Sequence, residues 1–314
     1  MQYAVIYGMD FSLICQQVLN GLQFGVMLFL MASGLTLVFG IMDLINLAHG
    51  SLFMVGAYLC AMVFQKTGSF LLGLLVALPG AAVVGIAVEA IALRKLYARD
   101  HLDQVLATFG LILFFNELTK IIWGPRPMFL DVPRALSGTV EIIPGAPYPA
   151  FRLAIIAVGA VVAVFLYLII TRTRLGMLIR ASATNREIVG AMGVNVKLLY
   201  TLVFGLGALL AGLAGAMAGP LLAVEVGMGE DVLILTFVVI VIGGIGSIRG
   251  ALLGAVLVGV IDTLGRAFLP ALFKLFLDPA TADGVGASLS SMAIYILMAV
   301  ILTWKPKGLL PAHG

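Results

Sequence analysis

The chain has 314 residues, of which 62% are hydrophobic and only 11% are charged, and its formal net charge at pH 7 is +3. Soluble domains carry about 25% charged residues because their surface must be hydrated. This composition, with a mean hydropathy of +1.17, therefore excludes an ordinary water-soluble protein. The small positive charge is explained by basic loops, and we expect no nucleic-acid partner.

Apolar runs without Asp, Glu, Lys or Arg recur along the chain, for example over 11–42, 44–65 and 67–88. Because about 20 apolar residues in a helix cross a bilayer, these runs predict an all-α integral membrane protein with a single transmembrane domain over 1–314. No basic region precedes the first run, so we expect no cleavable signal peptide. The predicted spans are 11–33, 34–65, 70–93, 104–124, 151–171, 198–219, 231–248, 251–269 and 288–304.

The number of crossings depends on the second segment. If 34–65 enters the membrane and returns, about eight spans remain and both chain termini lie inside. If every segment crosses fully, there are nine and the N-terminus lies outside. We favour eight spans with interrupted or re-entrant elements near 40–50 and 243–250, and the side of the N-terminus stays open.

Basic residues predict the orientation, because short cytoplasmic loops collect Lys and Arg. The segment 172–197 holds five basic residues against one acid, and Lys305 and Lys307 follow the last span. We therefore expect this segment and the C-terminus in the cytoplasm of a bacterium, with the protein in its inner membrane. The proline-rich loop 125–150 and the acidic loop 220–231 would then lie outside.

The first interruption follows the sequence Phe-Gly-Ile-Met of 39–42. Asp43, Asn46 and His49 recur every three residues before Gly50, so a helix would place them on one face. A charge within the bilayer costs several kcal/mol, by a disputed amount, unless it faces a polar cavity or a partner. We interpret this stretch as a broken helix that lines the solute pathway. The alternative is a short turn between two full spans.

The second interruption contains Gly243, Gly244, Gly246 and Ser247. Glycine inside a helix costs up to about 1 kcal/mol relative to alanine, so a continuous helix is disfavoured here. Irregular backbone at membrane depth is tolerated where it is buried in protein or lines a cavity. We assign these four residues to the solute pathway as well, because paired interruptions are typical of transporters. A plain loop at the membrane edge is the alternative.

The segment 172–197 is more patterned than an orienting loop requires. Ser182 or Thr184 could cap a short helix that begins near Asn185, and a glycine at 190 or 193 could end it. Glu187 suits the first turn of that helix. We expect a helix on the cytoplasmic face that docks onto a partner, against the simpler alternative of a positively charged loop.

No motif for catalysis or metal binding is present. The chain has no phosphate-binding loop and no Gly-Lys dipeptide. It has no His-Glu-x-x-His or Cys-x-x-Cys pattern, so we expect no metal site, no catalytic residues and no cofactor in this chain.

Three motifs in order resemble the permease family of branched-chain amino-acid ABC transporters. They are Gly-Leu-Thr-Leu-Val-Phe-Gly-Ile-Met-Asp-Leu-Ile-Asn-Leu-Ala-His-Gly at 34–50, the pattern of 176–195, and Gly-Gly-Ile-Gly-Ser at 243–247. The chain length is similar to that of the LivH-type subunit. In the second motif, the resemblance assigns contact with an ATPase to Arg180, Asn185, Arg186, Glu187 and Gly193.

The resemblance implies an importer that works by alternating access. Its other parts would be a second, LivM-type permease in a heterodimer, two cytoplasmic ATPases that use ATP and Mg, and a periplasmic solute-binding protein. Branched-chain amino acids are the default solutes, and the same family includes permeases for urea, short amides and aromatic or other carboxylates. A secondary transporter that works without ATP is the competing interpretation.

Arg249 departs from the family pattern, in which an uncharged residue often follows the glycine run. It either lies at the cytoplasmic edge or faces the pathway and pairs with an anionic group.

Overall fold

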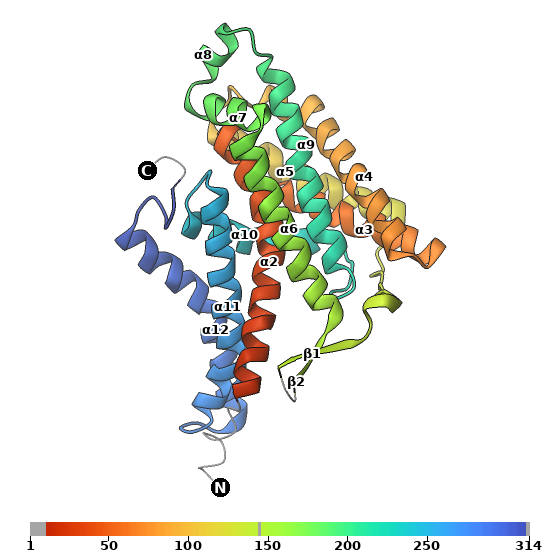
Figure 1. The fold of residues 1–314 in the computed structure, drawn as a ribbon, viewed down its shortest axis with the longest axis vertical. Coiled ribbons are helices and arrows are strands. Elements are labelled where there is room, and N and C mark those ends of the chain that lie inside the picture. Colours follow the sequence, from red (N-terminus) through yellow and green to blue (C-terminus); the bar gives the residue numbers. More distant parts are fainter. Residues whose placement is uncertain (1–10, 144–145, 312–314) are drawn as a thin grey trace.

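The computed structural model describes residues 11–143 and 146–311, which form a helical bundle with one small β-hairpin (Figure 1). The α-helices are α2 (Phe11–Met42), α3 (His49–Thr67), α4 (Phe70–Ile91), α5 (His101–Trp123), α6 (Ala150–Arg172), α7 (Arg174–Thr184), α8 (Arg186–Ala191), α9 (Val196–Ala218), α10 (Met228–Gly243), α11 (Ile248–Phe273) and α12 (Pro279–Trp304). Short 3-10 helices are η1 (Leu93–Lys95) and η2 (Arg134–Leu136), and the strands are β1 (Thr139–Ile143) and β2 (Ala146–Pro149). Seven of the described helices are long and apolar enough to cross a membrane. The predicted all-α membrane fold is confirmed.

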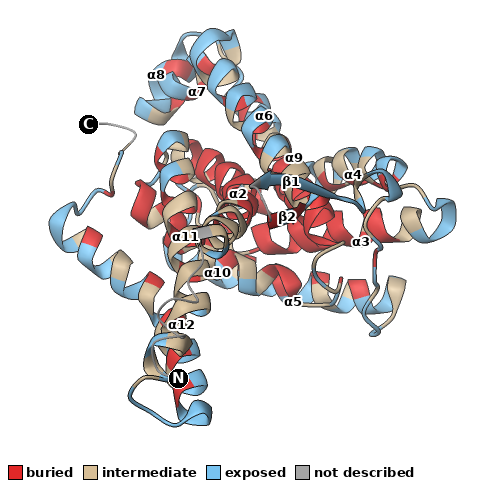
Figure 2. Ribbon diagram, turned by 60° about the horizontal axis from the view of Figure 1, so that its bottom comes forward, coloured by how far each residue is buried: buried red, intermediate tan, exposed pale blue. Residues whose placement is uncertain are grey.

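Helix α2 forms the centre of the bundle. Within its most apolar stretch 83% of the residues are buried, against 22% for α4, α5, α6 and α12 (Figure 2). These outer helices expose large apolar side chains such as Leu75, Phe109, Val161 and Val300. Water would make that exposure costly, so the outer surface suits the acyl chains of a bilayer.

Glycines let the helices inside this shell approach each other closely. A Cβ on Gly50, at the start of α3, would lie 2.5 Å from the carbonyl oxygen of Gly229 in α10. Gly56 of α3 likewise packs directly on Gly212 of α9. Small residues at helix contacts are typical of membrane bundles, where packing replaces the hydrophobic effect as the force between helices.

The boundary predicted between 33 and 34 is wrong. Helix α2 continues through this point to Met42, and the next helix starts at His49. Gly34 occurs inside α2 because it packs against α9, where an added Cβ would lie 2.6 Å from the carbonyl oxygen of Gly207. The glycine marks a helix contact and does not end a helix. The interruption itself falls at 43–48, within the predicted stretch.

The two ends of the bundle carry different structures. Helices α7 and α8 project from one end, while α2 begins at the other end, which also carries the hairpin (Figure 1). The connection 125–150, predicted as an extended loop, contains the antiparallel pair β1–β2. It is joined to the second predicted outer loop by two backbone hydrogen bonds of 2.9 Å between Met128 and Val224.

Candidate functional site

The connection 43–48 between α2 and α3, called here the inner connection, turns back into the protein. Asp43 is exposed and has a φ of 50°, which a residue other than glycine seldom adopts. Asn46 and His49 are fully buried. His49 lies near the Met31 carbonyl of α2, yet neither its ring nitrogens nor the Asn46 amide make a hydrogen bond with the described residues. Such unpaired buried groups are exceptional in folded proteins.

Gln104 of α5 fixes the inner connection. Its Oε1 accepts a hydrogen bond of 3.3 Å from the backbone N–H of Ile45. Its Nε2 donates to the carbonyl oxygens of Leu96 and Arg99, at 3.3 and 3.2 Å. One side chain therefore ties the inner connection to the α4–α5 turn.

The residues 244–247 between α10 and α11 form the second interruption, called here the glycine break. Gly244 and Gly246 have φ values of 108° and 79°, which favour glycine. Gly243 packs directly on the backbone of Gly250, so neither has room for a side chain. Ser247 caps α11 by accepting a hydrogen bond of 3.1 Å from the Gly250 N–H.

The C-terminal segment completes the glycine break. The backbone N–H groups of Leu309 and Leu310 donate to the carbonyl oxygens of Ile242 and Gly243, both at 2.9 Å. The last carbonyls of a helix lack partners within that helix and need others when they are buried. No signal in the sequence identified these donors, because they lie more than 60 residues away from α10 in the chain.

The two interruptions lie against each other. A Cβ on Gly40, in the last turn of α2, would stand 2.9 Å from the Cα of Gly246. The sequence predicted two breaks and a related role for them. Their contact, through glycines on both sides, is an observation of the structure.

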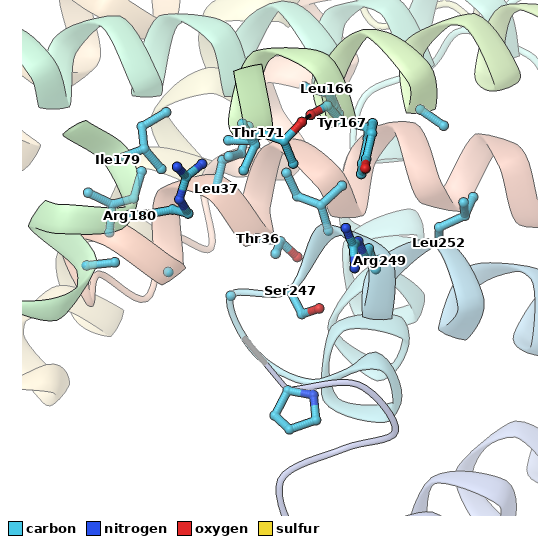
Figure 3. A pocket seen from close by; sticks show the side chains of 18 of the residues that line it. Thr36, Leu37, Leu166, Tyr167, Thr171, Ile179, Arg180, Ser247, Arg249 and Leu252 are labelled. Atoms are coloured by element: carbon cyan, nitrogen blue, oxygen red, sulfur yellow. Dashed lines mark hydrogen bonds between the residues drawn. The ribbon is translucent and has the colours of Figure 1, made fainter. Parts of the chain in front are cut away.

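A cavity of about 640 Å³ opens beside this contact, between α2, α6, α7 and α11 (Figure 3). Its walls are mostly apolar, with Leu37, Leu166 and Leu252 among them. All three sequence motifs contribute to its lining: the first through Thr36, Leu37, Gly40 and Ile41, the second through Ile179, Arg180, Ala183 and Thr184, and the third through Gly246 and Ser247. The cavity is therefore the place where residues distant in the sequence converge.

Two guanidinium groups line this cavity, and one buried hydroxyl without a partner lies in its wall. Arg249 stacks over the ring of Tyr167, with its Cζ 5.3 Å from the ring centroid. Arg180 reaches the cavity from α7 (Figure 3). Thr36 is 1% exposed, and its hydroxyl oxygen has no hydrogen-bond partner among the described residues. Arg249 is exposed and lines this cavity.

The segment 172–197, called here the coupling segment, folds as two short helices. Asn185 itself caps α8, accepting hydrogen bonds of 3.0 Å from the N–H groups of Glu187 and Ile188. The expected caps, Ser182 and Thr184, lie instead in the last turn of α7, a helix that the sequence analysis did not predict. Arg186 and Glu187 are exposed at the tip of the bundle, and Gly193 turns the chain with a φ of 86°.

One tyrosine links the coupling segment to the end of α2. The hydroxyl of Tyr200, near the start of α9, donates a hydrogen bond of 3.3 Å to the carbonyl oxygen of Ile41. The same hydroxyl interacts with the Arg186 guanidinium. Sequence analysis missed Tyr200, because an isolated tyrosine near a helix start carries no pattern.

A buried carboxylate lies behind Tyr200. Glu89 is fully buried and forms an ion pair of 2.8 Å with Arg94. It also accepts hydrogen bonds from Tyr97 at 2.6 Å and Thr201 at 2.8 Å. Burial, followed by the hydrogen bond to Glu89, raises the pKa of Tyr97, so this hydroxyl remains a donor at neutral pH. The ring of Tyr97 meets that of Tyr200 edge-on, with centroids 5.4 Å apart.

The predicted site residues thus separate into groups. Arg180, Gly246 and Ser247 meet at the cavity, and Asp43 is exposed at the end of α2. Asn46 is buried in the inner connection and His49 at the start of α3, and Gly50, Gly243 and Gly244 are used in backbone packing. Within 11–143 and 146–311 no cluster of three or more His, Cys, Asp or Glu side chains could hold a metal ion.

Comparison with known proteins identifies the family. The model of the family described as "branched-chain amino acid transport system / permease component" matches residues 17–302. The high-affinity branched-chain amino acid transport system permease protein BraD of Pseudomonas aeruginosa is 29% identical over 309 residues, covering 94% of this chain and 95% of that protein. LivH of Escherichia coli K12, with the same description, is 28% identical over 279 residues, covering 84% and 90%.

A more distant relative is named for the transport of a different solute. The ribose import permease protein RbsC of Escherichia coli K12 is 26% identical over 253 residues, covering 74% of this chain and 72% of that protein. No solved structure matches significantly. The matched length, the apolar helices and the three motifs in order lead to one conclusion: this chain is a multi-pass membrane protein that belongs to the branched-chain amino acid transport permease family and is of the LivH type.

Proposed function

We propose that this chain is a permease subunit of an ATP-driven importer that moves branched-chain or related amino acids across the inner membrane by alternating access. The observation that carries the proposal is the convergence of three elements, helix α2, the coupling segment and the glycine break, around one cavity whose shape depends on all of them. A movement of any one of these elements changes the shape of that space.

The contacts around Tyr200 support a route for this movement. An ATPase that pulls on α8 would act on Arg186, which interacts with Tyr200. Tyr200 in turn holds the Ile41 carbonyl, two residues before the inner connection. Rigid elements joined by such contacts can transmit a displacement between distant sites. We infer that the inner connection responds to the coupling segment along this route.

The distribution of charge supports the orientation. The end of the bundle that carries α7 and α8 is the basic one, so we place it in the cytoplasm together with the C-terminus. Helix α2 begins at the opposite end (Figure 1), so this proposal requires an odd number of crossings and disfavours eight. The N-terminus itself lies outside the described residues, and its position on the outer side is part of this proposal.

The proposal requires partners that supply energy and substrate. Two ATPases would bind ATP and Mg in the cytoplasm and dock on Asn185, Arg186 and Glu187. A LivM-type permease would complete the pathway through the bilayer, and a periplasmic solute-binding protein would dock on the joined loops 125–150 and 220–231. This chain would bind no nucleotide of its own.

The buried acids argue against a secondary transporter driven by protons or sodium. Such a transporter uses acidic groups within the membrane as relays. Glu89 and Asp262, the two buried acids among the described residues, each form an ion pair, at 2.8 Å with Arg94 and 2.9 Å with Arg266. Both pairs give these carboxylates a structural role.

The first test is association with the ATPases. The full chain, purified with its cognate ATPase subunits, should lose them on Glu187→Ala or Arg186→Ala, while its abundance in the membrane stays constant. Arg99→Ala is the control, because Arg99 is an exposed cation in the α4–α5 turn, outside the coupling segment 172–197. Equal retention of the ATPases by all three variants would contradict docking on α8.

The second test concerns the solute and the pathway. Uptake of labelled leucine, urea and benzoate by cells that express the complete system separates the solute classes of this family. Asp43→Ala and Asn46→Leu should lower uptake more than they lower abundance. If uptake and abundance fall together, these residues have a structural role and the pathway lies elsewhere.

A further inference from the structure

The cavity between α2, α6, α7 and α11 combines apolar walls with positive charge. Its volume of about 640 Å³ falls within the range of about 300–1,000 Å³ typical of ligand pockets. Among the residues that line it, Arg180 and Arg249 are charged, and none is an Asp or Glu. Neither arginine forms an ion pair with a described residue, and both side chains are exposed. The electrostatic complement of this cavity is therefore an anion.

A zwitterionic amino acid does not fit this chemistry. Its carboxylate could pair with an arginine, but its ammonium group would find no acid in the lining. Burying an unpaired charge is costly. An anionic amphiphile, with one charged group and a long apolar part, meets all the features of the cavity.

The membrane supplies such a molecule. Helix α6 carries exposed apolar side chains beside the cavity, among them Tyr167 and Leu168 at 45% and 48% exposure. Basic pockets between membrane helices near the cytoplasmic surface are suited to anionic headgroups. We propose that this cavity binds an anionic phospholipid, with its phosphate on Arg180 and Arg249 and an acyl chain along Leu37, Leu166 and Leu252.

The position of this site gives the lipid an influence on the transport machinery. Arg180 belongs to the coupling segment, and Arg249 follows the glycine break by two residues. The phosphate of one lipid would therefore connect the two elements and hold them in one arrangement. The choice of leaflet rests on the orientation proposed above. The binding itself does not, and it can be measured without transport.

The test uses the full-length chain, purified in mild detergent and depleted of lipid. Native mass spectrometry with phosphatidylglycerol and with phosphatidylcholine of the same acyl chains should show preferential retention of phosphatidylglycerol. Arg180→Gln and Arg249→Gln should each weaken that binding about fivefold, since a basic residue near an anionic surface contributes about 1 kcal/mol. Arg174→Gln is the matched control on the same helix, because Arg174 does not line the cavity.

A second variant separates volume from charge. Ala163→Phe fills the wall of the cavity on α6 while it leaves both arginines in place, and it should also lower phosphatidylglycerol binding. Equal binding of the two lipids, or an equal loss on Arg174→Gln, would overturn the proposal. Displacement by inorganic phosphate alone would assign the site to a free anion, and displacement by leucine would assign it to the solute. Either result refutes the lipid site, and the second would strengthen the permease assignment.

Discussion

Tyr200 provides the sharpest test of how the coupling segment acts on the inner connection. Tyr200→Phe keeps the ring and its packing on Tyr97 but removes the hydrogen bond to the Ile41 carbonyl and the contact with Arg186. At 3.3 Å the bond is longer than the usual 2.7–2.8 Å for a hydroxyl donor, so its net contribution is small, about 0.5–1 kcal/mol. The melting temperature should fall by only about 2 °C.

Transport should respond more strongly than stability. If the same energy of about 1 kcal/mol biases the inner connection toward the transporting arrangement, the number of solutes moved per ATP hydrolysed should drop about fivefold. The assay is uptake and ATP hydrolysis by the complete system in proteoliposomes. Tyr295→Phe is the matched control, since Tyr295 lies on the outer helix α12 and is 42% exposed.

A double-mutant cycle decides whether Arg186 and Tyr200 act through one contact. Two changes that remove the same interaction are not additive. Arg186→Lys, which keeps the positive charge for docking but not the guanidinium group, combined with Tyr200→Phe should therefore lower the transport ratio no further than the stronger single change. Independent, multiplicative losses would refute the route through Tyr200, as would a normal ratio in Tyr200→Phe alone.

Other perturbations test the packing around the site. Glu89→Gln should lower the free energy of unfolding by about 2–3 kcal/mol. This is less than the 3–5 kcal/mol for breaking a fully buried ion pair, because Arg94 is 36% exposed and water can hydrate it. Thermal unfolding in detergent measures the change, and a shift no larger than that of Glu117→Gln would contradict it. Gly50→Ala should destabilise the contact with Gly229 by about 1–3 kcal/mol, again measured by thermal unfolding, whereas Gly110→Ala, at a position with open space, should not. A chain that ends at residue 308 should have a free energy of unfolding about 2 kcal/mol lower, because it lacks the two hydrogen bonds from Leu309 and Leu310. A chain that ends at residue 311 is the control, and equal stability of the two chains would show that the capping bonds contribute little.

Much of this fold could be predicted from single-residue patterns. The uncharged runs located the membrane helices because a charge in the bilayer is costly at any position. The positions of both interruptions followed from the glycines of 243–246 and from the polar residues of 43–49. These features depend on residues close together in the chain, which is why the sequence alone reveals them.

The parts that could not be predicted depend on contacts between distant segments. The boundary predicted between 33 and 34 was wrong, and only the packing of Gly34 on Gly207 explains a glycine inside α2. Tyr200 is important because its hydroxyl contacts the Ile41 carbonyl, although the two residues are 159 positions apart in the sequence. The cavity is also invisible in the sequence, because its wall comes from four helices. Whether Asn46 and His49 contact solute stays a prediction, and their unpaired polar atoms are a reason to test it.

The bonds from Leu309 and Leu310 to the end of α10 have a consequence for biosynthesis. Because the chain is made from its N-terminus, α10 and α11 are synthesised well before Leu309 and Leu310, so the carbonyls of Ile242 and Gly243 form these bonds only after the segment around residue 310 has been made. The end of α10 therefore gains this stabilisation, about 2 kcal/mol, late in folding. A tag fused directly behind residue 311 would interfere at this step, whereas one separated by a flexible linker would leave it undisturbed.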